Sequence, residues 1–172
     1  MFRSRPHSRR AAFGVLFVVA SIAPNVAGCQ APRDSGVALI TPATLRRTLD
    51  SLRTAGQQSR ELSERGTFHY LAMQRSQTGR VEVHAEWTDI FVVTDGAGQL
   101  RHSGRAGNGR TSAQGEYRGG VMTNGRLQDL SIGDVVVIPA GTAHQIVLAP
   151  GQRIGYLAIK LHVPRMPLPN DP

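Results

Sequence analysis

Short runs of β-branched or alternating residues, about ten residues apart, fill the chain from Thr67 onward. The runs are TFHYLAMQR, GRVEVHAEW, DIFVVTDG, GQLRHSG, DVVVIPAG, HQIVLAPG and RIGYLAIKLHV, and Gly, Asn, Asp and Pro separate them. Strands with turn residues at this interval are typical of an antiparallel sandwich or barrel. No long helices alternate with them, so a parallel sheet is not expected. We therefore predict one all-β antiparallel domain over residues 67–163.

Residues 1–28 predict an export signal rather than part of this domain. Four arginines precede an apolar run at residues 11–23, which is too short to span a bilayer and ends in small residues. The sequence VAGC at residues 26–29 resembles the lipobox of bacterial lipoproteins, which implies lipidation of Cys29 and a lipid anchor in the cell envelope. SRR at residues 8–10 is similar to part of a twin-arginine signal. A plain secretory signal with an incidental cysteine is the alternative.

The remaining composition excludes two other classes of protein. The formal net charge falls from +8 to +4 without residues 1–28, because four arginines and no acidic residue lie there. No basic stripe with interleaved aromatic residues follows, so we expect no nucleic-acid partner. Cys29 is the single cysteine, so disulfides do not hold the fold. The 144 residues that remain are enough for one hydrophobic core.

Residues 29–66 predict a tether followed by a helical segment. Thr41 and Pro42 form a good helix start, a capping hydroxyl followed by proline at the first helical position. Three leucines then recur at helical spacing, and Gly56 weakens the pattern. We interpret residues 57–66 as a further helical turn or two that ends at Gly66. Residues 164–172 are proline-rich, and we expect them to be extended or disordered.

Strand alternation predicts which polar side chains share a face. Glu82 and Glu86 lie on the same face of a strand as His84, and the next strand presents Asp89 on its apolar face. His144 likewise lies on the face that carries Ile146 and Leu148. If these faces line the barrel, four side chains meet inside it: His84, Glu86, Asp89 and His144. Unpaired burial would cost several kcal/mol for a carboxylate and about 1–3 kcal/mol for an imidazole. A divalent transition metal would remove both costs.

The spacing of Gly133, Pro139, Gly141 and His144 resembles the second motif of the cupin superfamily. That motif is a glycine, five to seven residues, and then Pro-x-Gly-x-x-His; the asparagine that often closes it is Leu148 here. The first cupin motif, with its His-x-His and a later glutamate, is similar to part of GRVEVHAEWTDIFVVTDG. In this interpretation His84 takes the place of the first histidine, Glu86 replaces the second, and Asp89 replaces the glutamate. The gap between Glu86 and Asp89 is then shorter than usual.

The resemblance covers about residues 67–163 and implies a cupin-type β-barrel, or jelly roll. By the same resemblance, His84, Asp89, His144 and Glu86 are metal ligands, with iron, manganese, zinc or a similar divalent metal as cofactor. Dioxygenases, isomerases, decarboxylases, sugar-binding modules and storage proteins share this fold, so the resemblance leaves the reaction open. Only three ligands are expected if Glu86 does not bind the metal.

Each of these residues has an alternative role. Asp89 is a metal ligand or the cap of a turn, and Glu86 is a ligand, a base beside the metal or an exposed side chain. Further aromatic and basic side chains contact a substrate or serve packing: Tyr70, Tyr117, Arg118 and Tyr156. We expect Trp87 to pack, and His69, His102 and His162 to be structural or exposed.

Two functional classes remain open. The chain is a metal-dependent envelope enzyme that acts on a small organic molecule, with dioxygenase-like or isomerase-like chemistry. Alternatively, it is a non-catalytic lipoprotein that binds a small ligand and has a degenerate metal site. The run VVVI is apolar on both faces and needs cover on both, which a homodimer, a second sheet or a helix over residues 43–65 would supply.

Overall fold

The structure is a computed structural model that describes residues 37–171, apart from the side chain of Arg65. The predicted signal segment and Cys29 lie outside the described residues. Within the described part, no helix is long and apolar enough to cross a membrane.

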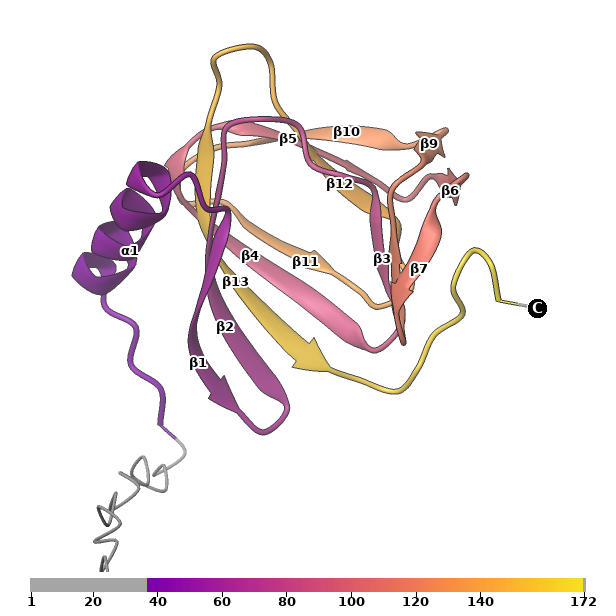
Figure 1. The fold of residues 1–172 in the computed structure, drawn as a ribbon, viewed down its shortest axis with the longest axis horizontal. Coiled ribbons are helices and arrows are strands. Elements are labelled where there is room, and N and C mark those ends of the chain that lie inside the picture. The colour runs from indigo at the N-terminus through magenta and orange to yellow at the C-terminus, as the bar shows by residue number, and fades with distance from the viewer. Residues whose placement is uncertain (1–36, 172) are drawn as a thin grey trace, which may run out of the picture. The chain divides into compact units, whose positions relative to one another are not determined.

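Two antiparallel sheets face one another and enclose the interior of a barrel (Figure 1). The five-stranded sheet has the order β1 (Ser59–Arg65), β2 (Phe68–Arg75), β13 (Ile154–His162), β4 (Trp87–Gly96) and β11 (Val135–Ile138). The six-stranded sheet has the order β10 (Arg126–Leu130), β5 (Gly98–His102), β12 (His144–Val147), β3 (Glu82–His84), β8 (Glu116–Arg118) and β7 (Arg110–Ala113). A separate ribbon pairs β6 (Arg105–Gly107) with β9 (Val121–Thr123).

The interior is filled by apolar side chains from both sheets. Alternate residues of β4, β12 and β13 point inward, as the two-residue period of a strand requires. The central cluster consists of Phe91, Val93, Leu100, Leu130, Ile138, Ile146, Leu148, Ile154, Tyr156 and Ala158. The predicted all-β antiparallel barrel with a short N-terminal helix is confirmed.

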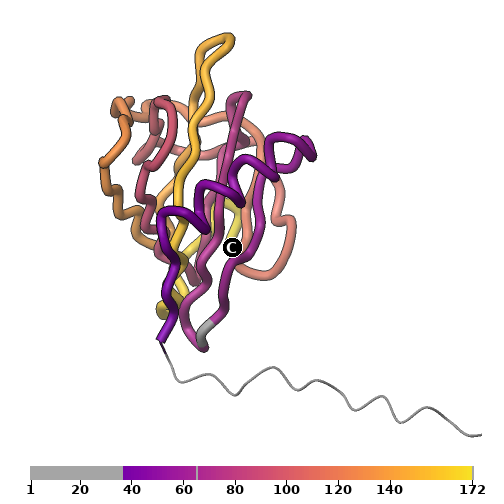
Figure 2. The backbone as a smooth tube through the Cα atoms, turned by 90° about the vertical axis from the view of Figure 1, so that its left-hand side faces the viewer, coloured from indigo at the N-terminus to yellow at the C-terminus, as the bar shows by residue number. Residues whose placement is uncertain are grey.

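The single described helix, α1 (Pro42–Thr54), packs on the outside of the five-stranded sheet. Thr41 caps it by accepting a hydrogen bond from the Thr44 amide, and proline occupies the first turn, as the sequence predicts. Its buried leucines contact Ala72 of β2 and Leu157 of β13. Figure 2, seen from the side of the helix, shows α1 lying across the strands.

The interpretation of residues 57–66 as helical is wrong. These residues include β1, which pairs with β2 through a turn at Gly66, where φ is +57°. The strand is largely polar because it forms an exposed sheet edge, with a register shift between Glu61 and Ser63. Backbone hydrogen bonds to β2 therefore determine the conformation of β1. A polar edge strand has little hydrophobic periodicity, so the sequence pattern does not identify it. The barrel begins at Ser59 rather than at Thr67.

The run VVVI forms β11, the edge strand beside β4. Val136 and Ile138 face the interior, whereas Val135 and Val137 are 63% and 59% exposed. Helix α1 packs on β2 and β13 instead, so among the described residues neither a helix nor a second sheet covers these two valines. A homodimer remains a prediction.

The proline-rich tail is extended but packed against the barrel. The amide of Met166 donates to the carbonyl of Ala85 at 2.7 Å, and that of Val163 donates to Glu86 at 2.9 Å. Leu168 is only 6% exposed and belongs to a cluster at one end of the barrel with Val81, Val83, Ala85, Tyr117, Met122 and Ala143. The tail therefore completes the core at this end.

We expect Leu168→Ala to destabilise the protein by about 2–5 kcal/mol, because it leaves a cavity in this cluster. Leu127→Ala is the matched control, since Leu127 is 52% exposed, and should cost no more than about 0.5 kcal/mol. Denaturant unfolding of the two variants measures the difference. Equal midpoints would show that the tail does not contribute to the core.

Candidate metal centre

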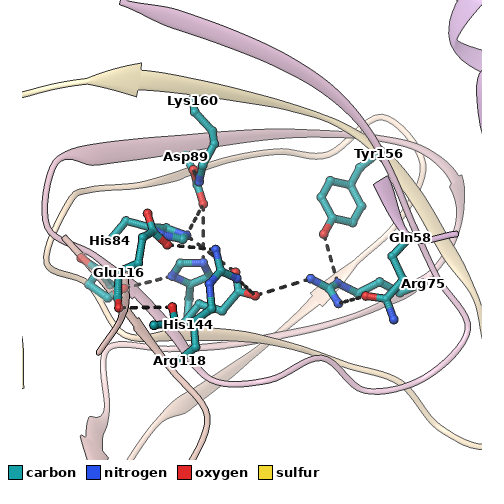
Figure 3. A network of polar contacts seen from close by, with 12 residues as sticks. Gln58, Arg75, His84, Asp89, Glu116, Arg118, His144, Tyr156 and Lys160 are labelled. Atoms are coloured by element: carbon teal, nitrogen blue, oxygen red, sulfur yellow. Dashed lines mark hydrogen bonds and ion pairs between the residues drawn. The ribbon is translucent and has the colours of Figure 1, made fainter. Parts of the chain in front are cut away.

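Four candidate ligands meet inside the barrel from opposite sheets. Glu82 and His84 lie on β3 and His144 begins β12, both in the six-stranded sheet, while Asp89 extends from β4 of the facing sheet. His84, His144 and Asp89 are 2–4% exposed. Figure 3 shows the two imidazoles and the Asp89 carboxylate directed toward one another.

A tight turn delivers His144 to this position. Pro139 ends β11, and Gly141 follows with φ of +79°, a conformation that favours glycine. The Gly141 amide donates to the His84 carbonyl at 2.8 Å, so the turn is tied to the strand that carries the other histidine. The Pro-Ala-Gly sequence thereby fixes the two histidines relative to each other.

Strand register places a charged partner opposite three of the four candidate ligands. Lys160 is directly opposite Asp89, Arg118 opposite Glu82, and Glu116 opposite His84. The corresponding contacts are Lys160 Nζ to Asp89 Oδ1 at 2.5 Å, Arg118 Nη1 to Glu82 Oε1 at 2.5 Å, and His84 Nδ1 to Glu116 Oε2 at 2.7 Å. Directly opposed side chains of opposite charge stabilise antiparallel pairs. The site is therefore organised by the ladder itself.

Hydrogen bonds leave the same atom of both imidazoles facing the interior. His84 donates from Nδ1 to the Glu116 carboxylate, and His144 donates from Nδ1 to the Thr142 carbonyl at 3.0 Å. The Nε2 atoms of both histidines are buried and have no hydrogen-bond partner among the described residues. A histidine that ligates a metal through Nε2 typically donates its other N–H in this way.

The distances around these atoms fit a transition metal. Asp89 Oδ2 lies 3.3 Å from His84 Nε2 and 3.5 Å from His144 Nε2, and Glu82 Oε2 lies 3.6 Å from His84 Nε2. Bonds of about 2.1 Å to one ion separate neighbouring ligand atoms by about 3.0–3.4 Å. Glu82, His84 and His144 each offer a ligand atom within 4.8 Å of the others. Two imidazoles with carboxylates suit iron, manganese or zinc.

The same cluster shifts the proton affinities of its members. Burial alone would lower the pKa of His84, but Asp89, Glu116 and Glu82 raise it to about 10. Burial, together with the positive charge of His84, lowers the pKa of His144. Burial would raise the pKa of Glu82, yet the nearby His84, whose Nε2 lies 3.6 Å from Glu82 Oε2, and the charge of Arg118 lower it to about 2. Without a metal, a proton on His84 balances the carboxylates.

The cluster lies at the inner end of a cavity of about 550 Å³. Apolar walls come from both sheets, including Phe91, Ile146 and Ala158. Exposed lining residues such as Gln77 and Thr78, in the loop between β2 and β3, place the mouth at that loop. A small molecule can therefore enter the barrel and reach His144, Asp89 and Glu82.

The structure brings together three of the four predicted ligands and replaces the fourth. Asp89 lies within β4 beside both histidines rather than capping a turn. Glu86 lies outside the cluster, because β3 ends at His84 and the chain bends, leaving its Oε2 3.8 Å from His162 Nε2. Glu82 takes the expected position. With Glu82 and His84 as the motif pair, the gap to Asp89 is no longer short.

Of the predicted substrate contacts, Arg118 and Tyr156 line the cavity and Tyr70 does not. Leu71 and Met73 of β2 line it, so Tyr70 is on the outer face, where its ring stacks on Phe68 at 6.2 Å. Tyr117 is buried and accepts a hydrogen bond from the Gly109 amide. Trp87 packs edge-on against His69 and His162, each at 4.9 Å.

Sequence reasoning missed Glu116, Lys160 and Arg75 as parts of the site. Strand register brings Glu116 opposite His84 and Lys160 opposite Asp89, whereas Arg75 ends β2, just before β3 in sequence, and lines the cavity. One sequence feature does point to Glu116. It is two residues from Arg118, so strand alternation places both side chains on the same face.

Comparisons with known proteins give structural neighbours only. No family model and no curated protein matches the sequence significantly. BH2720 from Bacillus halodurans has 16% identity and a TM-score of 0.54, over 81% of this chain and 88% of that chain. A cupin-2 domain protein from Shewanella frigidimarina has 17% identity and a TM-score of 0.44, over 65% and 89%. A predicted oxalate decarboxylase from Thermotoga maritima has 14% identity and a TM-score of 0.45, over 61% and 79%.

The chain is an antiparallel two-sheet β-barrel whose fold is similar to that of BH2720, and this is the architecture that the resemblance of its sequence motifs implies. Identities of this size show the fold alone. The function depends on the cavity and on the residues that line it.

The metal-free protein should lose stability as the pH rises from 6.5 to 10. The folded-state pKa of His84 is raised to about 10 from an ordinary 6.5, so its contribution is complete below pH 6.5 and lost as the pH passes 10. Thermal unfolding in a chelator checks this, with His84→Gln as the control that should flatten the profile. A wild-type profile as flat as that of the variant would contradict a protonated His84.

Proposed function

We propose that this protein binds one divalent transition metal inside the barrel and acts there on a small organic molecule. His84, His144, Asp89 and Glu82 would hold the metal. The observation that carries the proposal is the pair of buried Nε2 atoms without hydrogen-bond partners, flanked by two carboxylates at 3.3–3.6 Å. Buried polar atoms are nearly always paired, so two unpartnered ring nitrogens beside two carboxylates indicate a site for a bound cation.

The chain's own residues would hold the ligands in place. Glu116 keeps a proton on His84 Nδ1 and so leaves Nε2 for the metal. Lys160 fixes one oxygen of Asp89, and Arg118 holds both Glu82 and Glu116. When bound, a metal of this kind supplies a Lewis acid to an oxygen atom of the small molecule. Dioxygenase-like or isomerase-like chemistry is the reaction class that we propose.

A metal-free ligand-binding pocket is the second candidate, and a charge count favours it. Three carboxylates, Glu82, Asp89 and Glu116, face three cations when His84 is protonated, the others being Arg118 and Lys160. These six groups are then electrically balanced without a metal, and Arg75, 3.8 Å from Glu82, is an additional cation. In this case the cavity binds a small molecule and carries out no reaction.

Elemental analysis of the purified protein separates the two candidates. We expect about one transition metal per chain, lost in His84→Ala and in His144→Ala, and a Glu82→Gln affinity lower by about 10-fold or more. Glu86→Gln is the matched control and should keep the metal, since its carboxylate lies outside the cluster.

Protein that stays free of metal after reconstitution with iron, manganese and zinc would overturn the metal proposal. Loss of metal in Glu86→Gln but not in Glu82→Gln would overturn the ligand set. Circular dichroism of each variant shows that the barrel has formed.

We further propose that the protein is exported and anchored in the cell envelope through Cys29. The support is the sequence of residues 1–29, with its arginines, apolar run and lipobox-like VAGC. Cys29→Ser should abolish incorporation of a labelled fatty acid and release the protein from membranes. Unchanged labelling would contradict the anchor.

A further inference from the structure

We propose that the ligand of this cavity is a small organic acid, whose carboxylate is bound by Arg75 and Tyr156. The inference deepens the proposed function and rests on the cavity being its ligand site. Two observations support it: the charged side chains that line the cavity, and the ion pairs and hydrogen bonds that these side chains already make.

The lining is positively charged even before a metal is added. Four cationic side chains, Arg75, Arg80, Arg118 and Lys160, face two carboxylates, Glu82 and Asp89. A bound metal or a proton on His84 increases the excess. Because water is partly excluded from such a cavity, an excess of one sign acts strongly on a ligand of the opposite sign.

Three of these cations are already neutralised or solvated. Lys160 contacts Asp89 at 2.5 Å, and Arg118 contacts Glu82 and Glu116 at 2.5 and 2.9 Å. Arg80 is exposed, so water screens its charge. These side chains have little left to offer a ligand.

Arg75 is held differently. Its side chain is 12% exposed, yet its hydrogen bonds go to neutral groups at long distances, 3.3 Å to the Tyr156 hydroxyl and 3.2 Å to Gln58 Oε1. The nearest carboxylate with which it pairs, that of Glu82, is 3.8 Å away, beyond hydrogen-bond distance. A buried guanidinium is costly unless an anion pairs with it, and its planar donors match a carboxylate.

Tyr156 adds a second donor beside it. Its hydroxyl accepts from Arg75 Nε and keeps its own proton to donate. Burial raises the pKa of Tyr156, while Arg75 opposes this, so the phenol is protonated at neutral pH. Figure 3 shows Arg75 and Tyr156 at one side of the polar network and the two histidines at the other.

This separation defines the ligand class. One carboxylate would be bound by Arg75 and Tyr156, while a second oxygen-bearing group a few atoms away reaches the histidine end. A cavity of about 550 Å³ accepts a molecule of this size. Short dicarboxylates are therefore suitable probes, and their diamides are uncharged controls of the same shape.

The test is calorimetric titration of the full protein, of measured metal content, with oxalate, malonate, succinate and glutarate and with malonamide and succinamide. We expect at least one acid to bind and the matching diamide to bind at least 10-fold more weakly. Arg75→Gln should weaken acid binding about 10- to 100-fold, with partial recovery in Arg75→Lys, and Tyr156→Phe a few-fold. Arg126→Gln, an exposed arginine on β10 outside the cavity, should change nothing.

The outcomes separate this inference from the metal proposal. Acid binding through Arg75 in protein that stays free of metal after reconstitution supports the inference and overturns the metal proposal. Metal-loaded protein that binds no acid, binds diamides equally well, or is unaffected by Arg75→Gln overturns the inference and leaves the metal proposal standing. Unchanged metal content in Arg75→Gln and Arg75→Lys shows that the site is intact in those variants.

Discussion

The hydrogen bond from His84 Nδ1 to Glu116 determines what the interior of this barrel can do. It joins two strands that are far apart in sequence, fixes the rotation of the imidazole and directs Nε2 toward His144 and Asp89. Arg118 holds Glu116 in turn, so the carboxylate cannot turn away. Without this bond, the ring could rotate and the two Nε2 atoms would no longer converge.

The two ends of the barrel differ, and the cavity opens at only one of them. At one end the chain after β13 returns, and Leu168 closes an apolar cluster with Val83 and Tyr117. The other end is bordered by the polar loop between β2 and β3, where Gln77 and Thr78 are exposed. A ligand therefore meets the charged side chains of Arg75 and Arg80 before it meets the histidines. The sealed end keeps the apolar core dry behind the site.

The sequence predicted the parts of this structure that depend on local periodicity. The strands and the inward direction of Asp89 and His144 follow from alternation, and the Pro-x-Gly turn identifies the strand that carries His144. Alternation places Glu82 and Glu86 on the same strand face as His84, so it could not show which of them is the ligand. That depends on where β3 ends, and it ends at His84. Glu116 and Lys160 could not be found, because long-range strand register brings them opposite His84 and Asp89. Arg75 is near Glu82 in sequence, but the path of the loop between β2 and β3, which places it at the cavity, cannot be derived from alternation. The polar edge strand β1 was missed because its conformation comes from pairing with β2.

Stability alone does not account for so much charge inside a barrel. Replacing buried ion pairs by apolar side chains of similar volume is often neutral or stabilising, so such pairs are weak contributors to folding. Here an apolar cluster already fills the space beside them. The charged groups are also not distributed at random, since His84, Asp89 and Glu82 have strongly shifted pKa values, and Asp89 and Glu82 line one cavity. Shifted groups gathered in a cleft indicate a functional site. The proton that balances His84 in the metal-free protein and the metal that would replace it occupy the same electrostatic position, so this cluster is built to hold positive charge at its centre.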